Sequence, residues 1–223
     1  DASHELKTPL ASIRLLTDSL LQADHMDGET AREFLNDIGD EADRLTRITE
    51  KLLTLTRLDT APAAEDVPVD VGAVVERVEH MLSPLARAVE VSLELKLQPG
   101  CVVLATEDDL YQIAFNLMEN AVKYNLPGGR VLVTLTADGG RVVLRVEDTG
   151  VGIPKADLPK IFDRFYRVDK ARSRAAGGTG LGLSIVRDTV LQHGGAVTAR
   201  RREPEGTCFE VSFAQWNGEE VGR

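Results

Sequence analysis

The amino-acid sequence predicts an α+β protein in which a helical hairpin precedes a two-layer α/β sandwich. The first 60 residues show apolar residues at helical spacing only, whereas strand and helix patterns are interleaved after residue 70. A stretch of prolines, alanines and acids separates these two regions. Helices segregated against a mainly antiparallel sheet form two layers. The expected division is a hairpin at 1–60, a linker at 61–69, a sandwich at 70–216 and a tail at 217–223.

The bulk composition is that of an ordinary globular domain. Of the 223 residues, 43% are hydrophobic and 28% are charged. The net charge of −10 argues against nucleic-acid binding, which needs a basic face. The two cysteines are far apart and only four histidines are present, so we expect no structural zinc site and a reducing cytoplasm.

Two further features of the sequence are the length of its apolar runs and the way it begins. No uninterrupted apolar run reaches the roughly 18 residues of a membrane helix, so we expect no membrane contact by these residues. The sequence begins without Met inside a helical pattern, which indicates a piece of a longer protein.

A first helix is expected from residue 1 to about residue 24. Its apolar positions recur at three- and four-residue spacing, at Leu6, Leu10, Ile13 and Leu20. His4 is out of phase with this stripe and should face water, with Lys7 and Thr8 on the same side. Pro9 removes one intrahelical hydrogen bond, so we expect a kink that loosens the turn carrying His4 and Glu5. A solvated histidine is, by itself, most often a surface residue.

A second helix follows a polar break at 24–28. Its apolar positions are close to a heptad pattern, at Phe34, Ile38, Leu45, Ile48, Leu52, Leu55 and Leu58. Two antiparallel helices cannot bury such stripes alone, whereas a four-helix bundle made by two chains can. We therefore predict a homodimer through residues 1–59.

The sandwich is predicted from helix N-cap residues, turn residues and the alternation of apolar and polar residues in strands. Asp70 and Thr106 are suitable N-cap residues for two helices, and a third helix spans 181–192. Glycines at 139 and 140 mark a hairpin turn. The expected strands are 89–97, 101–105, 130–136, 141–147, 196–202 and 207–213.

Two asparagines stand one turn apart in the helix that Thr106 begins. Asn116 and Asn120 share one helix face, and Lys123 and Tyr124 follow them. Neutral amide oxygens beside a lysine suit a hydrated Mg²⁺ that bridges phosphates. Taken alone, such a pair is more often a surface feature.

A second motif follows the strand at 141–147 and reads Asp148-Thr149-Gly150-Val151-Gly152-Ile153-Pro154. Its glycines allow positive φ and close approach of the backbone to a ligand. A carboxylate at this sheet end can accept a hydrogen bond from an exocyclic amine such as adenine N6. By itself, Asp-x-Gly is usually only a turn.

A third motif is the glycine-rich run at 177–182, which leads into an apolar helix. Free backbone N–H groups and the helix dipole form an anion site there. The run lacks the lysine–serine pair of a P-loop and the βαβ context of a dinucleotide fold.

A basic segment at 160–174 lies between the second and third motifs. We interpret it as a lid that closes over a triphosphate, with Gly177 and Gly178 as its hinge and with Phe162 and Phe165 holding its base. A solvated loop is the alternative. Its six cations are Lys160, Arg164, Arg167, Lys170, Arg172 and Arg174.

The segment Ser3-His4-Glu5-Leu6-Lys7-Thr8-Pro9-Leu10 resembles the phosphoacceptor box of bacterial sensor histidine kinases. The resemblance implies that His4 accepts the γ-phosphoryl group of ATP and that Glu5 assists as a base. It also implies that Thr8 orients water when phosphate is removed from a partner, which would give a phosphatase activity. The chemistry is reasonable because neutral imidazole is a nucleophile near neutral pH and a carboxylate can fix its tautomer.

The motifs after residue 110 resemble, in order and spacing, the four ATP-binding boxes of the histidine kinase catalytic domain. The segment Phe-Asp-Arg-Phe-Tyr-Arg-Val-Asp at 162–169 is one of them. This domain has the Bergerat ATP-binding fold, shared with Hsp90-like, gyrase and MutL ATPases. The resemblance implies ATP and Mg²⁺ as cofactors, with Asn116 and Asn120 on the metal and Asp148 reading the adenine amino group. The implied nucleotide-binding residues are Asn116, Asn120, Lys123, Tyr124, Asp148, Gly150, Gly152, Ile153, Tyr166, Arg167, Gly178, Thr179, Gly180, Leu181, Gly182 and Leu183.

The function implied is that of an ATP-dependent protein-histidine kinase in a two-component system. It would autophosphorylate His4 and pass the phosphoryl group to an aspartate of a response regulator receiver domain. The resemblance also implies anchoring of the whole protein in the bacterial cytoplasmic membrane, with this part in the cytoplasm. Two alternatives remain open: a nucleotide-sensing scaffold, which the His4–Glu5 pair disfavours, and an ATPase or serine kinase, which the hairpin at 1–59 disfavours.

Overall fold

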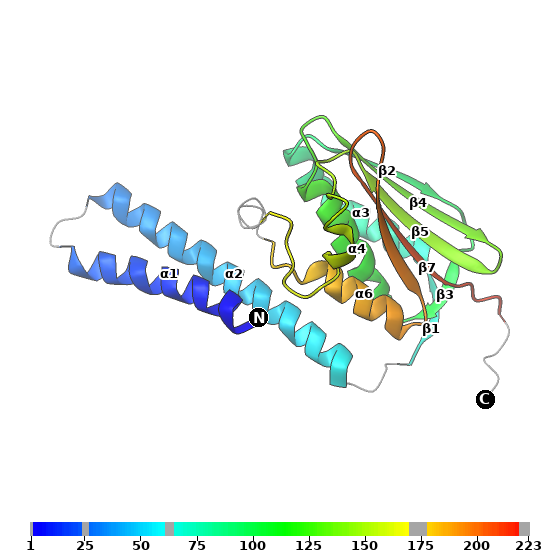
Figure 1. Ribbon diagram of the computed structural model, residues 1–223, viewed down its shortest axis with the longest axis horizontal. Coiled ribbons are helices and arrows are strands. Elements are labelled where there is room, and N and C mark those ends of the chain that lie inside the picture. The colour runs from blue at the N-terminus through cyan, green and yellow to red at the C-terminus, as the bar shows by residue number, and fades with distance from the viewer. Residues whose placement is uncertain (1, 24–26, 61–64, 170–177, 219–223) are drawn as a thin grey trace.

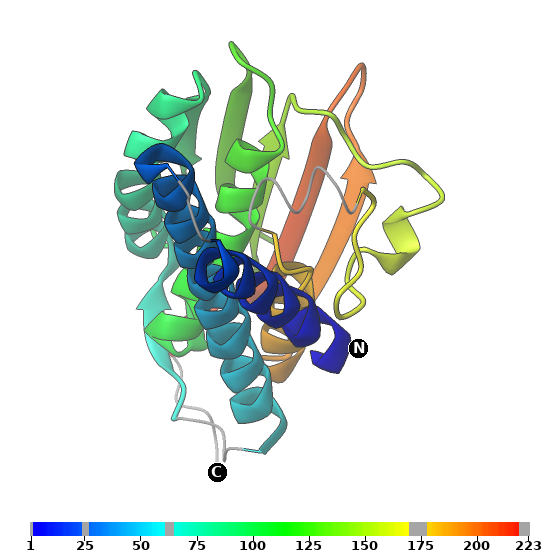
Figure 2. The same cartoon turned by 90° about the vertical axis from the view of Figure 1, so that its left-hand side faces the viewer.

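The computed structural model describes residues 2–23, 27–60, 65–169 and 178–218 and confirms the two predicted parts (Figure 1). A helical hairpin extends from one side of an α/β sandwich, and the far half of its second helix lies against the sandwich. Figure 2 shows the hairpin crossing in front of the helical layer. Within the described residues, no helix is both long and apolar enough to cross a membrane.

The hairpin consists of α1 (Ala2–Gln22) and the longer α2 (Gly28–Thr60). α1 continues through Pro9, which is buried. Asp27 caps α2, because its Oδ1 accepts hydrogen bonds from the backbone N–H groups of Glu29 and Thr30 at 3.0 and 2.9 Å. Residues 24–26 of the predicted turn lie outside the described residues.

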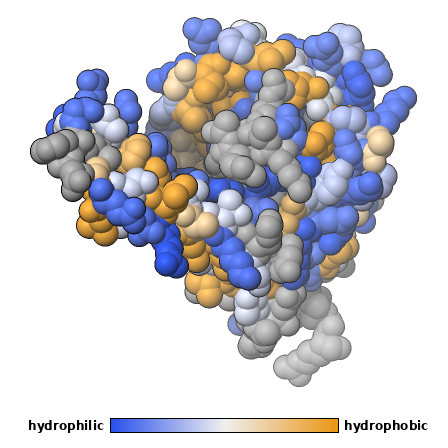
Figure 3. Space-filling view, turned by 60° about the vertical axis from the view of Figure 1, so that its left-hand side comes forward, coloured by the Kyte–Doolittle hydropathy of each residue, from blue (hydrophilic) through white to orange (hydrophobic). Residues whose placement is uncertain are grey.

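The hairpin has both buried and exposed apolar side chains within one chain. Ile48 and Leu55 are buried, 1% and 3% exposed. Figure 3 shows apolar side chains gathered along the hairpin surface. Five leucines are more than half exposed, namely Leu10, Leu15, Leu21, Leu35 and Leu53.

A mixed five-stranded sheet forms one layer of the sandwich, with strand order β2-β4-β5-β7-β6. β2 and β4 are parallel and the other neighbours are antiparallel, as the sequence predicted. The strands are β2 (Ser92–Leu97), β4 (Arg130–Asp138), β5 (Arg141–Asp148), β6 (Ala196–Arg201) and β7 (Thr207–Ala214). A separate antiparallel pair joins β1 (Val67–Asp70) to β3 (Val102–Ala105).

Three helices form the second layer and cover one face of the sheet (Figures 1 and 2). They are α3 (Val71–Ala88), α4 (Glu107–Lys123) and α6 (Gly182–Gln192), and a short 3-10 helix spans Leu158–Lys160. Along β5, Val142, Leu144 and Val146 alternate with more exposed residues and pack against this layer. The core therefore lies between sheet and helices.

The predicted caps and turn are confirmed. The Asp70 side chain accepts from the N–H of Gly72, and the Thr106 hydroxyl accepts from the N–H of Asp109. Gly139 and Gly140 have φ of +55° and +76°, as a tight two-residue hairpin turn requires.

Two element boundaries differ from the sequence prediction. The strand expected from residue 89 begins at Ser92, because Val89 caps α3 and Glu90 has φ of 57°, which ends the helix. β1 begins at Val67, inside the range expected as linker. Pro68 hid this strand, since proline is compatible only with edge strands such as this two-stranded pair.

His193 ties the end of α6 to the segment that enters β1. Its side chain is 2% exposed, and its Nε2 and Nδ1 atoms lie 2.9 Å from Asp109 and 3.0 Å from Asp66. The hydrogen bond to Asp109, followed by that to Asp66, raises the pKa of His193 despite its burial. The same contact lowers the pKa of Asp109.

Replacing His193 by glutamine should destabilise the sandwich in a pH-dependent way. The raised pKa of His193 means that its charged form stabilises the fold fully below about pH 6.5 and that this contribution is lost as pH rises through the folded pKa. The lowered pKa of Asp109 places the acid limit below about pH 4. We expect a loss of about 2 kcal/mol at pH 6 and a smaller loss at pH 9, measured by urea unfolding. The exposed His80, replaced in the same way, is the control; an equal loss for His193→Gln at both pH values would contradict the charged pair.

Candidate functional site

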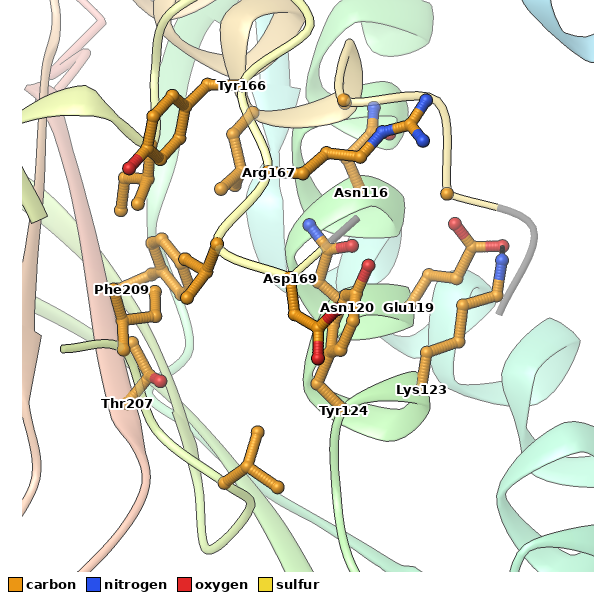
Figure 4. A pocket seen from close by; sticks show the side chains of 18 of the residues that line it. Asn116, Glu119, Asn120, Lys123, Tyr124, Tyr166, Arg167, Asp169, Thr207 and Phe209 are labelled. Carbon is orange, nitrogen blue, oxygen red and sulfur yellow. Dashed lines mark ion pairs between the residues drawn. The ribbon is translucent and has the colours of Figure 1, made fainter. Parts of the chain in front are cut away.

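A cavity of about 460 Å³ opens between α4, the segment after β5 and the glycine-rich run (Figure 4). Its volume is in the range of small-molecule and cofactor sites. Fourteen of the sixteen residues predicted to bind nucleotide line it: Asn116, Asn120, Lys123, Tyr124, Asp148, Gly152, Ile153, Tyr166, Arg167, Gly178, Thr179, Gly180, Gly182 and Leu183.

One face of α4 forms a polar wall of the cavity. Asn116, Glu119, Asn120 and Lys123 recur at helical spacing and project into it. Lys123 forms an ion pair with Glu119 at 2.8 Å. The Asn116 Nδ2 donates to the carbonyl of Gln112 at 2.8 Å, which leaves its Oδ1 as the atom available to a ligand.

The start of α6 lies directly beside that amide oxygen. A Cβ at Gly182 would lie 2.9 Å from Oδ1 of Asn116, so a larger residue would displace the amide. The first turn of α6 also presents free N–H groups, as a helix N-terminus does for an anion. A polar amide and a helix N-terminus therefore lie side by side in the cavity wall, an arrangement that suits an anionic ligand.

Asp148 also lines the cavity, as a buried carboxylate. It stands at the end of β5, is 6% exposed, and its Oδ1 accepts from the N–H groups of Gly150 at 2.8 Å and Thr207 at 3.2 Å. Burial raises the pKa of Asp148, although these hydrogen bonds act in the other direction. The Thr207 side chain also donates a hydrogen bond to this carboxylate, which has capacity to accept one more from a ligand in the cavity.

Two of the predicted nucleotide-binding residues shape the cavity without lining it. Gly150 lies against the end of α4, where a Cβ would be 2.3 Å from the carbonyl oxygen of Tyr124. Leu181 is fully buried and packs with Ile185 against Leu55 of α2. Gly150 therefore permits close packing of the loop, and Leu181 fixes the glycine-rich run to the hairpin.

The sequence interpretation missed ten lining residues. Thr207 and Phe209 come from β7, and pairing of β7 with β5 would have revealed them, because Phe209 is in register with Val146. Lys51 comes from α2, and no local sequence pattern indicated that this residue would line the cavity. The ten are Lys51, Glu119, Val151, Pro154, Ile161, Val168, Asp169, Arg201, Thr207 and Phe209.

The segment between the motifs is described as far as residue 169, so residues 170–174 of the expected lid and its hinge residue Gly177 lie outside the described residues. Phe162 packs edge-on against Phe209, with ring centroids 6.4 Å apart. Phe165 packs instead against the buried cluster that Leu55 of α2 forms with Leu181 and Ile185. A Cβ at Gly180, whose φ is +71°, would lie 2.8 Å from the Phe165 backbone, so only glycine suits this crossing.

The phosphoacceptor helix reaches the same cavity through an ion pair. His4 lies in α1, and its side chain is outside the described part of the chain. The next residue, Glu5, accepts from Nη2 of Arg167 at 2.7 Å, and Nη2 of Arg44 lies 3.7 Å from the same oxygen. Thr8 is half-buried one turn further along α1.

The donor set fits Mg²⁺ bound to phosphates better than a metal held by the protein alone. No group of three or more His, Cys, Asp or Glu side chains suited to a metal ion occurs in the described residues. The amide oxygens of Asn116 and Asn120 are neutral oxygen ligands on one wall. Mg²⁺ usually keeps several waters and is bound through few protein ligands plus substrate phosphates.

Comparison with known proteins agrees with this geometry. Residues 1–61 match the His Kinase A (phospho-acceptor) domain, and residues 105–216 match the family of histidine kinase-, DNA gyrase B-, and HSP90-like ATPases. The probable sensor histidine kinase TcrY of Mycobacterium tuberculosis is 41% identical over 95% of this chain and 44% of its own length. The chain spans about half the length of the curated relatives it matches.

Several solved structures resemble nearly the whole chain, among them those of ShkA and ThkA. Full-length ShkA in complex with AMPPNP has a TM-score of 0.71 and 31% identity, and the match covers 97% of this chain and 45% of ShkA. ThkA in complex with the response regulator protein TrrA has a TM-score of 0.79, over 96% of this chain and 60% of ThkA; at 20% identity this match shows the fold alone. With the hairpin, the sandwich and both family models in agreement, this chain belongs to the sensor histidine kinases, as a phosphoacceptor domain joined to an ATPase domain.

Proposed function

We propose that this chain is the ATP-dependent kinase core of a two-component system, which autophosphorylates His4 and passes the phosphoryl group to an aspartate of a response regulator. One observation carries the proposal: Arg167 lines the nucleotide cavity and donates to Glu5, the neighbour of the phosphoacceptor, at 2.7 Å. The cavity and the acceptor helix are thus in direct contact.

The proposed roles follow the geometry of the cavity. Asp148 accepts from the adenine amino group, Asn116 and Asn120 hold Mg²⁺, and Lys123 and Arg167 face the phosphates. When bound, Mg²⁺ supplies charge neutralisation at the transferred phosphoryl group. The residues of the chain contribute binding and orientation, which supply most of the catalysis in phosphoryl transfer. Glu5 would orient the His4 imidazole and stabilise its cation.

The proposed assembly is a homodimer through residues 1–59. The five exposed leucines of the hairpin support it, since a second hairpin would cover them in a four-helix bundle. The His Kinase A match over residues 1–61 covers this same segment.

The proposed partner is the receiver domain of a response regulator, because ThkA, which shares this fold, is known in complex with the response regulator TrrA. Thr8, four residues after the acceptor, is the proposed residue for a phosphatase activity toward that partner. We further propose that the whole protein is anchored in the bacterial cytoplasmic membrane, with this part in the cytoplasm. Its relatives are named as sensor kinases and are about twice as long as this chain.

Incubation with γ-labelled ATP and Mg²⁺ tests the proposed activity. The parent chain should acquire label that is lost in acid, because phosphohistidine is acid-labile. His4→Gln should acquire none while still binding ATP, since the substitution leaves the described lining residues of the cavity unchanged.

Three outcomes would contradict this assignment. Normal labelling of His4→Gln would exclude His4 as the acceptor. Acid-stable label would favour a serine kinase. ATP binding without label, in a chain shown to be dimeric, would favour a nucleotide-sensing scaffold.

A further inference from the structure

Lys51 is the residue of the helical hairpin that enters the nucleotide cavity. It lies on α2 and lines the cavity together with residues of the sandwich. Its position is fixed by apolar packing on the same helix. The next-turn Leu55 forms a buried cluster with Leu181 and Ile185, and the neighbouring Leu52 packs against it. This part of α2 is therefore held against the end of the glycine-rich run and the start of α6.

The charges around Lys51 leave its ammonium group without a counter-ion. Glu119 is the carboxylate of the facing α4 wall, but it already pairs with Lys123 at 2.8 Å. Across the described residues, no carboxylate lies within ion-pair distance of Lys51. Burial lowers the pKa of Lys51. The negative charge of Glu119 acts in the opposite direction, whereas the positive charges of Lys123 and Arg47 lower the pKa further. A partly buried cation in this position favours an anionic ligand.

We propose that Lys51 binds the phosphate groups of the nucleotide, so that the phosphotransfer hairpin contributes a binding residue to a cavity otherwise built by the ATPase domain. This inference rests on the proposed function, in which the cavity holds ATP. The stripe of Asn116, Glu119, Asn120 and Lys123 faces the phosphate end, and Lys51 lines the cavity beside it. Asp148, which also lines the cavity, is the proposed contact for the base.

This arrangement couples nucleotide binding to docking of the hairpin. Lys51 can reach the phosphates only while α2 lies against α6, so the docked arrangement should bind ATP more tightly than an undocked one. Because coupling is reciprocal, ATP should stabilise docking by the same factor. The ATPase domain without the hairpin lacks Lys51, so its ATP affinity would not benefit from this contact.

Binding measurements on the full chain test the role of Lys51. His4→Gln serves as the parent, which prevents turnover, and calorimetry gives the dissociation constants of Mg²⁺–ATP and of adenosine, which carries no phosphate. Lys51→Met should weaken ATP binding about tenfold, as expected for one lost hydrogen bond to a charged group, and leave adenosine binding unchanged. Lys51→Arg keeps the charge and should stay within about twofold of the parent.

Arg47→Ala is the matched control. Arg47 lies one turn earlier on α2, is exposed and does not line the cavity. Its replacement by alanine removes one positive charge, as Lys51→Met does. It should change ATP affinity by less than about twofold, as expected for an exposed charge.

Several results would overturn the inference. These are unchanged ATP binding by Lys51→Met, an equal loss for ATP and adenosine, or an equal loss with Arg47→Ala. If Lys51→Met fails to fold, Lys51→Gln replaces it and must show the same selective loss. A folded parent that binds no ATP would instead refute the proposed function itself, and with it this inference.

Discussion

Replacing Asp148 by asparagine is expected to weaken ATP binding about a hundredfold while the sandwich stays folded. The carboxylate is buried, and one oxygen already accepts from the N–H groups of Gly150 and Thr207. The Thr207 side chain donates as well, and the remaining acceptor capacity of the carboxylate serves the proposed hydrogen bond from the adenine amino group. Asparagine has one acceptor oxygen and one NH₂ donor, so it must oppose either the two backbone donors or the adenine amine. Such a mismatch at a buried site costs about 2–3 kcal/mol, which corresponds to about a hundredfold in affinity.

The base preference gives this experiment a second readout. Guanine presents an oxygen where adenine presents its amino group. The parent should therefore discriminate strongly against GTP, and the asparagine NH₂ group should reduce that discrimination. Asp138→Asn, at the exposed hairpin turn between β4 and β5, is the matched control and should bind ATP as the parent does. Unchanged ATP affinity in Asp148→Asn would show that Asp148 does not contact the base.

Most of the fold could be predicted because its signals are local. The caps at Asp70 and Thr106, the turn glycines and the strand alternation each depend on neighbouring residues only. β1 was missed because its partner β3 is about 30 residues away and Pro68 argues against a strand. A two-stranded edge pair tolerates proline, which only the pairing itself could show.

The candidate site was predictable where motifs were contiguous. Asn116, Asp148 and Gly182 were found from short motifs, and they line one cavity. Phe209 was missed because it faces the cavity from a strand that carries no motif, through its pairing with β5. Lys51 was missed for a different reason, since its place depends on how α2 packs against α6.

Contacts between the two parts could not be predicted from the sequence. The bond from Arg167 to Glu5 joins residues 162 positions apart. Arg167 was expected to face phosphates, and in the structure its side chain is only 4% exposed and held by the acceptor helix. The basic composition of the segment predicted that Arg167 would bind an anion. It could not show which anion, because the Glu5 carboxylate and a phosphate group can both bind one guanidinium group.

Replacing Glu5 by glutamine is expected to lower the autophosphorylation rate at least about a hundredfold without weakening ATP binding. General-base assistance typically contributes 10²–10⁴-fold, and glutamine keeps the shape of the side chain but cannot accept a proton. ATP binding should not weaken, because Glu5 does not line the cavity and its weaker contact with Arg167 leaves that guanidinium freer for phosphate. The initial rate of labelling from γ-labelled ATP measures the effect. Glu41→Gln is the control, because Glu41 is also an ion-pair partner of Arg44, at 3.3 Å, and is not in the acceptor box.

The ion pair with Arg167 offers a second explanation for such a loss, and Glu5→Asp separates the two. Aspartate keeps a carboxylate beside His4, but it is one methylene shorter and cannot hold Arg167 at 2.7 Å without movement of α1. If Glu5 acts as a base, Glu5→Asp should retain most of the activity that Glu5→Gln loses. If Glu5 acts only by docking Arg167, both variants should lose activity alike. A phosphate group that enters the cavity competes with Glu5 for Arg167, so the base role requires that nucleotide binding release the carboxylate toward the imidazole of His4.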